Sequence, residues 1–333
     1  MVGRRRSLAN VFAMTQTIDT LLLLALPASG KSELRRYLAH LEPQVAGEDL
    51  HLGPTVQLDD YPYVHMMRRI AQELTLIDGD PVFFANDASS FAEPRDWGTL
   101  VQLLNEDYKL LGTRLERPES AALWLFERLD RARLAVGAVP ALSLLDDETR
   151  DRLVATLEDE ALELWADLAN SVEAWSDGDT VVIEFARGGP DGAAMPLTPP
   201  RGYAYSLSQL SGEILARSSI LYVWVTPEES RRRNDERARP GRAGDASILH
   251  HGVPESVMLG DYGSDDLPWL IESGGGDAVW VEGDGPAKRI PVAVFDNRSD
   301  HTSFLREDPD RWPLAAISAL HSELRVAFDR LVR

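Results

Sequence analysis

The sequence predicts an α/β fold in which a mainly parallel sheet is built from alternating strands and helices. Short apolar runs have the length and composition of buried strands, and they lie at 20–24, 55–58, 180–183 and 220–225. A helical pattern follows each run, as expected for parallel strands that are joined by crossover helices. Apolar residues at steps of four and three over 153–175 indicate one further long helix, which is expected to pack against neighbouring helices.

Length and composition limit the class of protein. The 333 residues suit one large domain with an insertion, or two domains, and 44% of them are hydrophobic. Cysteine is absent, which excludes disulfides and thiolate chemistry. No apolar run reaches the roughly 20 residues that cross a bilayer. The formal charge of −20 disfavours a nucleic-acid or membrane partner. Because cysteine is absent, we expect a cytoplasmic protein, and its oligomeric state stays open.

A phosphate-binding motif follows the first strand directly. The segment Ala25–Ser32 fits the pattern G-x-x-x-x-G-K-[ST] except at its first position, where Ala25 stands in place of glycine. In this pattern backbone N–H groups and a helix N-terminus surround phosphate oxygens, the lysine reaches the outer phosphates and the hydroxyl binds Mg²⁺. The motif predicts that the nucleotide contacts Pro27, Ala28, Ser29, Gly30, Lys31, Ser32 and Glu33.

The N-terminal region has a second interpretation as a secretory signal. Arg4-Arg5-Arg6 precedes the apolar run, and small residues follow it. However, Asp19 lies directly before the run, and cleavage near Ala28 would remove the motif. We therefore expect residues 1–17 to be a disordered leader, with Met1 or Met14 as the start of translation.

Acidic residues follow two of the predicted strands. Asp59 and Asp60 end the second strand, where an open α/β sheet binds its ligands, and either could act as a general base or hold Mg²⁺ through water. Their alternative role is to cap the next helix. Asp60 is the first choice for the base and Asp59 the second. Glu184 ends the third strand and is expected to reach the water shell of the same Mg²⁺.

Arginines supply candidate phosphate ligands. Arg187 lies three residues after Glu184, and Arg233 and Arg237 share a helix face after the fourth strand. Guanidinium groups suit a transition state that spreads negative charge over phosphoryl oxygens. The alternative for the last two is a solvated helix, salt-bridged by glutamates.

The remaining segments complete the expected organisation. Residues 18–84 and 180–333 are predicted to form the core. Residues 85–179 are predicted to form a helical insertion that covers the part of the cleft where a phosphoryl acceptor would bind. Helical patterns are also predicted over 207–218 and 313–332. The segments 278–281 and 292–295 are predicted as a hairpin or a fifth strand, and Asn297 just after them is a candidate for the adenine side of the nucleotide site.

Four segments in this order resemble the phosphate-loop (P-loop) NTPase superfamily, within it the kinase group that includes adenylate kinase and the small-metabolite, nucleoside and polynucleotide 5′-hydroxyl kinases. They are LPASGKSE, LDDYP, VVIEFARGG and WVTPEESRRRNDER. The first is most similar to the phosphate loop of polynucleotide-kinase-like members. The resemblance covers roughly residues 18 to 80 and 180 to 300.

The resemblance implies a three-layer fold with a five-stranded, mainly parallel sheet in the order 2-3-1-4-5, and ATP with Mg²⁺ as the phosphoryl donor. It implies that Lys31 holds the outer phosphates, that Ser32 and Glu184 serve the metal, and that Asp60 or Asp59 is the base. It also implies that Arg233 and Arg237 clamp the transition state.

The lead hypothesis is an ATP-dependent kinase that phosphorylates a small metabolite, a nucleoside or nucleotide being the commonest acceptor in the resembled group. The alternative is a regulatory ATPase or nucleotide-binding module that binds a protein partner through the helical insertion. The two differ in their dependence on the acceptor-side carboxylate, which a kinase needs for turnover and a hydrolysing switch does not.

Overall fold

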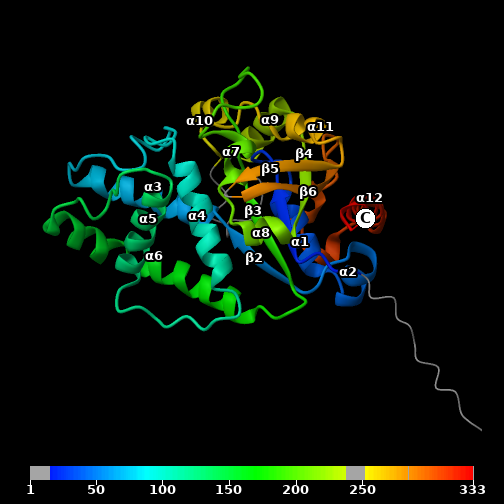
Figure 1. Cartoon of the computed structure of the whole chain (residues 1–333), viewed down its shortest axis with the longest axis horizontal. Helices are drawn as coiled ribbons and strands as arrows, with labels where there is room; N and C mark the ends of the chain where they lie inside the picture. Colours follow the sequence, from blue (N-terminus) through cyan, green and yellow to red (C-terminus); the bar gives the residue numbers. More distant parts are fainter. Residues whose placement is uncertain (1–15, 238–251, 284, 333) are drawn as a thin grey trace, which may run out of the picture.

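The computed structural model describes residues 16–237, 252–283 and 285–332. They form an α/β fold around one sheet of six strands (Figure 1). The strands are β1 (Thr20–Leu24), β2 (Thr55–Asp59), β3 (Thr180–Phe185), β4 (Ser218–Trp224), β5 (Ala278–Gly283) and β6 (Gly285–Asp296). The longer helices are α1 (Lys31–His40), α2 (Pro43–Leu50), α3 (Tyr61–Leu76), α4 (Asp96–Lys109), α5 (Ala121–Ala135), α6 (Asp147–Ala174), α9 (Pro227–Arg237) and α12 (Leu314–Leu331). The shorter helices are α7 (Gly202–Ser208), α8 (Gly212–Arg217), α10 (Glu255–Gly260) and α11 (Leu267–Ser273).

The strand order is β2-β3-β1-β4-β6-β5. All pairs are parallel except β5 with β6, which are antiparallel. The predicted α/β fold is therefore confirmed, but the predicted five strands in the order 2-3-1-4-5 are wrong.

The difference lies at the sheet edge, where the hairpin, one of the two alternatives predicted for 278–281 and 292–295, is present and adds a sixth strand. Strand β6 is 12 residues long, and its last part, Val292–Asp296, pairs with β4 while its first part pairs with β5. Lys288, Arg289 and Pro291 interrupt the apolar pattern, so the sequence showed only the buried end of this strand. The charged residues and the proline are tolerated because this part of β6 pairs with β5 alone, since the pairing with β4 begins at Val292.

One face of the sheet is covered by α1, α2 and α12. Leu21 and Leu23 of β1 point to this face, where they join apolar side chains of the three helices, including Leu34 and Phe328. Figure 1 shows α12 and α2 on the side of the sheet that lies away from α3 and α5. This layer places the N-terminus of α1 at the carboxyl end of β1.

The opposite face is covered by α4, α7, α8, α11 and the C-terminal part of α6. Leu22 and Leu24 of β1 point to it, because successive side chains of a strand alternate between faces. Tyr203 of α7 and Tyr108 of α4 lie in the same apolar cluster. The two faces together make the three-layer arrangement that the α/β prediction implied.

A second group of helices forms a lobe beside the sheet, to the left in Figure 1. Its apolar core joins α3, α4, α5 and α6 with the aromatic segment 83–97. The long helix predicted over 153–175 is present as the C-terminal part of α6. Helix α3 lies in the segment 18–84, yet it packs in this lobe, so the lobe begins directly after β2.

Two further predictions have clear outcomes. The helix predicted over 207–218 is wrong, because Ser211 caps a new helix there and splits the segment into α7 and α8, with residue 218 already in β4. Most of the predicted leader, residues 1–15, lies outside the described residues. Of the helices in the described ranges, none has the length and apolarity needed to cross a membrane.

Candidate functional site

The loop between β1 and α1 turns its carbonyl groups toward the protein. The carbonyl oxygen of Ala25 accepts hydrogen bonds from the Tyr203 hydroxyl at 2.9 Å and from Lys31 Nζ at 3.4 Å. The Ser29 hydroxyl donates to the carbonyl of Leu26 at 2.7 Å. Two more donors come from distant parts of the chain: Ser230 Oγ bonds the carbonyl of Pro27, and Asn297 Nδ2 that of Ser29, each at 2.7 Å.

The amide groups of the same loop are unpaired. Within the described ranges, the backbone N–H groups of Ala28, Gly30, Lys31 and Ser32 donate to no protein acceptor, and no side chain caps α1. Unpaired amides at a helix N-terminus, in a turn with left-handed residues, form an anion-binding concavity. The backbone amides of this loop alone can therefore donate hydrogen bonds to an anion such as phosphate.

Gly30 is required by its conformation and by its surroundings. Its φ is 99°, in the left-handed region, and a Cβ built there would lie 2.4 Å from Thr302 Oγ1 and 2.5 Å from Asn297 Nδ2. Ala25, in contrast, is fully buried and is not among the described residues with positive φ. Its backbone conformation is therefore open to alanine, which explains how the motif keeps its loop without the first glycine.

Lys31 lies at the first position of α1 with its ammonium group buried under the loop. Its Nζ is 3.9 Å from Glu184 Oε1. Burial lowers the pKa of Lys31, and the carboxylates of Glu184 and Asp59 oppose this shift. In this structure the ammonium group therefore lies between the Ala25 carbonyl and the Glu184 carboxylate.

Asp59 and Glu184 lie side by side at the carboxyl edge of the sheet. They are register partners on the parallel strands β2 and β3, and Arg35 Nη1 is 3.3 Å from a carboxylate oxygen of each. Burial, Glu184 and Asp60 raise the pKa of Asp59 to about 7. Asp59 also accepts a hydrogen bond from the backbone N–H of Tyr61 at 2.9 Å, whereas the N-cap residue of α3, Asp60, makes no side-chain capping bond.

Asp60 has a different environment. Its carboxylate pairs with Arg187 Nη1 at 2.6 Å, and its side chain is 8% exposed. Arg187 is itself 2% exposed and lies 5.0 Å from the ring centres of both Trp97 and Phe185. It also donates to Ser206 Oγ and to the carbonyls of Ala186 and Trp97. Arg187 is therefore occupied by protein groups, and Asp60 is less accessible than Asp59.

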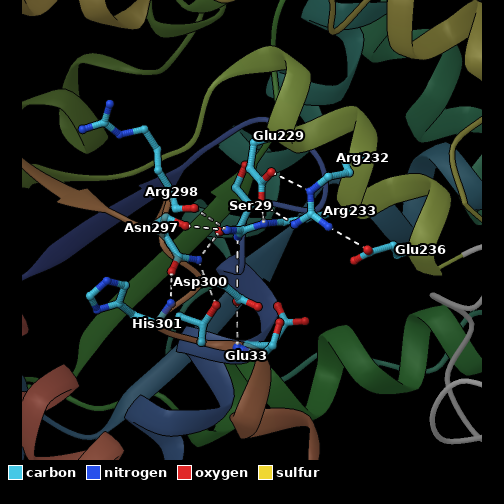
Figure 2. A network of polar contacts seen from close by, with 12 residues as sticks. Ser29, Glu33, Glu229, Arg232, Arg233, Glu236, Asn297, Arg298, Asp300 and His301 are labelled. Carbon is cyan, nitrogen blue, oxygen red and sulfur yellow. Dashed lines mark hydrogen bonds and ion pairs between the residues drawn. The ribbon is translucent and has the colours of Figure 1, made fainter.

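Arg233 and Arg237, the arginines predicted to clamp the transition state, lie beside the loop between β1 and α1. Arg233 is 4% exposed and donates to Glu229 Oε1 and to the carbonyl of Asn297, each at 2.6 Å. Figure 2 shows its guanidinium group directed at the Asn297 backbone, while the Asn297 side chain points toward Ser29. Asn297, predicted to lie on the adenine side, is fully buried and supports the loop backbone.

Glu33, predicted to contact the nucleotide, binds two arginines instead. Arg237 and Arg306 donate to its Oε1 at 2.8 and 2.7 Å. Burial would raise the pKa of Glu33, but the two arginines outweigh it and the pKa is lowered. Arg237 is thereby joined to the first turn of α1, whereas Arg233 is not directed at the loop amides.

Four residues that support the site were missed in the sequence. Tyr203, Ser230 and Thr302 come from segments far from the loop, and no sequence spacing connects them to it. Arg35 could have been found, since it lies four residues after Lys31 and therefore on the same face of α1.

The predicted metal residues are Ser32, in the first turn of α1, and Glu184. Among the residues that the structure describes, no group of three or more histidine, cysteine or acidic side chains could hold a metal ion. Two protein oxygens are compatible with Mg²⁺, which usually keeps several waters and takes its other ligands from substrate phosphates.

Comparison with known proteins adds no family to this description: no protein-family model matches the chain, and no curated protein matches its sequence.

Proposed function

We propose that the protein is an ATP-dependent phosphotransferase that phosphorylates a small metabolite, with nucleosides, nucleotides and other hydroxyl-bearing compounds as the acceptor class. One observation carries the proposal. In the loop between β1 and α1, the carbonyl groups accept hydrogen bonds from protein side chains, while the backbone amides have no protein acceptor among the described residues. Such a loop favours a phosphate over any uncharged ligand. The proposal also implies a cytoplasmic location, where ATP is plentiful.

The residues present fit ATP with Mg²⁺. The unpaired amides of the loop and Lys31 offer donors and positive charge for phosphate oxygens, and Ser32 with Glu184 offers oxygen ligands for the metal. When bound, Mg·ATP supplies the phosphoryl group and part of the charge that stabilises its transfer.

The acceptor side depends on the carboxylates. Asp59 is the better base in this proposal, because its side chain is 25% exposed and its pKa is raised to about 7, close to the value at which a general base works best. Its carboxylate would take the proton of the acceptor hydroxyl. Asp60 is paired with Arg187 and would hold the N-terminus of α3 in place. The order of preference for the base, Asp60 before Asp59 in the sequence analysis, is therefore reversed.

Mass spectrometry of reaction products tests the proposal. The purified protein is incubated with Mg·ATP and a pooled panel of nucleosides, nucleotides, sugars and amino alcohols, and a mass gain of one phosphoryl group is sought. Lys31→Ala should lower turnover by a factor of about 10²–10³. Lys109→Ala, on the exposed end of α4, should leave turnover unchanged.

Two further variants separate a kinase from a nucleotide switch. Asp59→Asn should lose turnover and keep ATP binding, and Asp60→Asn should lose less if Asp59 is the base. ADP formation without any phosphorylated acceptor, unaffected by Asp59→Asn, would contradict the proposal and favour a regulatory ATPase.

A further inference from the structure

The environment of Arg35 raises a question about the metal site. Asp59 and Glu184 are adjacent residues on neighbouring parallel strands, so two negative charges lie at the same edge of the sheet. Like charges in this arrangement repel each other, and the repulsion increases as burial removes water. The side chains of Asp59 and Glu184 are 25% and 10% exposed, so both are partly shielded from solvent.

A single nitrogen of Arg35 balances both charges. Nη1 lies 3.3 Å from Asp59 Oδ2 and 3.3 Å from Glu184 Oε2. This is not the bidentate fork in which two guanidinium nitrogens bind one carboxylate. One positive group is instead shared between two carboxylates, so neither carboxylate has a cation of its own at this nitrogen.

The remaining positive charge near this pair is Lys31, whose Nζ is 3.9 Å from the other oxygen of Glu184. Lys31 also donates to the Ala25 carbonyl, so it is held under the loop. Arg35 has fewer restraints: its side chain is 27% exposed, and its hydrogen bonds among the described residues are to these two carboxylates. It is therefore the cation that can leave.

We propose that Arg35 is an internal counter-ion that neutralises Asp59 and Glu184 in the ligand-free protein, and that it would release Glu184 when this carboxylate binds a divalent cation. The inference rests on the proposed function, since the metal is the one that would accompany ATP. It assigns Arg35 a positioning role: in the ligand-free protein it holds the two carboxylates together, and it makes metal binding without nucleotide weak.

Electron paramagnetic resonance of Mn²⁺ added to the full chain, without nucleotide, tests this. Arg35→Gln should bind Mn²⁺ at least about fivefold more tightly than the wild type, the lower end of typical coupling between two competing ligands. Arg36→Gln is the matched control, because Arg36 lies beside Arg35 on α1 but bonds the carbonyls of Leu305 and Arg306. It should bind Mn²⁺ as the wild type does. Equal or weaker binding by Arg35→Gln would overturn the proposal.

A second measurement does not depend on the folding of Arg35→Gln. Mg²⁺ added to the wild-type protein should shift the NMR resonance of the Arg35 guanidinium group, which Arg35→Lys identifies by its loss from the spectrum. A resonance that stays fixed while the metal binds would contradict displacement.

Calorimetry with ATP separates this inference from the proposed function. A wild-type protein that binds no ATP would refute the phosphotransferase, while the Mn²⁺ comparison would still decide the role of Arg35.

Discussion

Two charged clusters flank the loop between β1 and α1, and they are built differently. The rear cluster consists of Glu229, Arg233, Asn297 and Thr302, and its hydrogen bonds are 2.6–2.9 Å long. The front cluster consists of Lys31, Arg35, Asp59 and Glu184, and its contacts are 3.3–3.9 Å long. Arg233 is 4% exposed, whereas Arg35 is 27% exposed.

The difference indicates two roles for the same kinds of side chain. In the rear cluster, the short hydrogen bonds start from the buried donors Arg233 and Asn297, and the bonds lead to the loop backbone (Figure 2). Such contacts are costly to break and therefore fix a conformation. In the front cluster the contacts are longer and shared, so an incoming ligand can replace them. We infer that the rear cluster holds the loop and the front cluster serves the ligand.

Arg233 gives the largest expected effect on stability. Arg233→Gln removes the buried guanidinium group that binds both Glu229 and the Asn297 carbonyl. Glu229 keeps its bonds to Arg232, but the buried Asn297 carbonyl loses the hydrogen bond that Arg233 donates. Breaking a buried ion pair on one side costs about 3–5 kcal/mol. Chemical denaturation should show this loss in the free energy of unfolding, and any loss of ATP binding should follow from it.

The neighbouring arginine is the control for that experiment. Arg232 pairs with Glu229 and Glu236 but is 51% exposed, and an exposed pair contributes little. Arg232→Gln should leave the stability essentially unchanged. Equal effects of the two substitutions would mean that burial does not distinguish Arg233.

Gly30 tests how closely the rear cluster approaches the loop. Gly30→Ala adds a methyl group 2.4 Å from Thr302 Oγ1 at a φ of 99°, so we expect a loss of about 2–4 kcal/mol. Gly178→Ala is the matched control, because Gly178 has a φ of 98° with nothing within 4 Å of the added atom. It should lose about 1 kcal/mol, from the backbone conformation alone. Thermal melts of both variants measure the difference, and a difference near zero would exclude the steric contact.

Asp59 tests the front cluster through pH. Burial and the nearby carboxylates Glu184 and Asp60 raise the pKa of Asp59 to about 7, so between about pH 4 and 7 the folded protein binds more protons than the unfolded chain. Stability therefore falls as the pH rises through this window. Asp59→Asn stays uncharged and should be more stable than the wild type at pH 8 by about 1–2 kcal/mol, but not at pH 4.

Asp147 provides the control for this pH dependence. Its side chain is 89% exposed on α6, and Asp147→Asn should show no gain that grows with pH. Denaturant titrations at several pH values measure both variants. A gain for Asp59→Asn that is the same at pH 4 and pH 8 would contradict the ionisation of a buried carboxylate.

The front cluster was largely predictable from the sequence, and the rear cluster was not. The motif places Lys31 and Ser32 after a strand, and the acids after the second and third strands follow from the rule that parallel strands end at one edge. Asn297 and Arg233 were singled out, but as ligand contacts. Asn297 instead bonds the loop backbone, and Arg233 bonds the Asn297 carbonyl. Both contacts depend on which strand β6 pairs with, and that is decided by long-range packing.

The same reason explains the errors in the fold. The order of the parallel strands was implied by the resemblance, while the hairpin β5–β6 depended on residues without an apolar pattern. The choice between Asp59 and Asp60 also could not be made locally, because Arg187 is more than a hundred residues away from both.

Tyr203 contacts the loop beside the front cluster and gives the smallest expected effect. Its hydroxyl donates to the Ala25 carbonyl, the acceptor that Lys31 also uses. Tyr203→Phe removes one neutral hydrogen bond, which costs about 0.5–1.5 kcal/mol of stability. It also removes one restraint on the carbonyl that positions Lys31, so ATP affinity should fall about threefold, within the range of a single hydrogen bond. Tyr222→Phe is the control, because the Tyr222 hydroxyl bonds Asp265 and not the loop. It should lose stability without losing ATP affinity, and a calorimetric titration that finds the two variants equal in affinity would remove Tyr203 from the phosphate site.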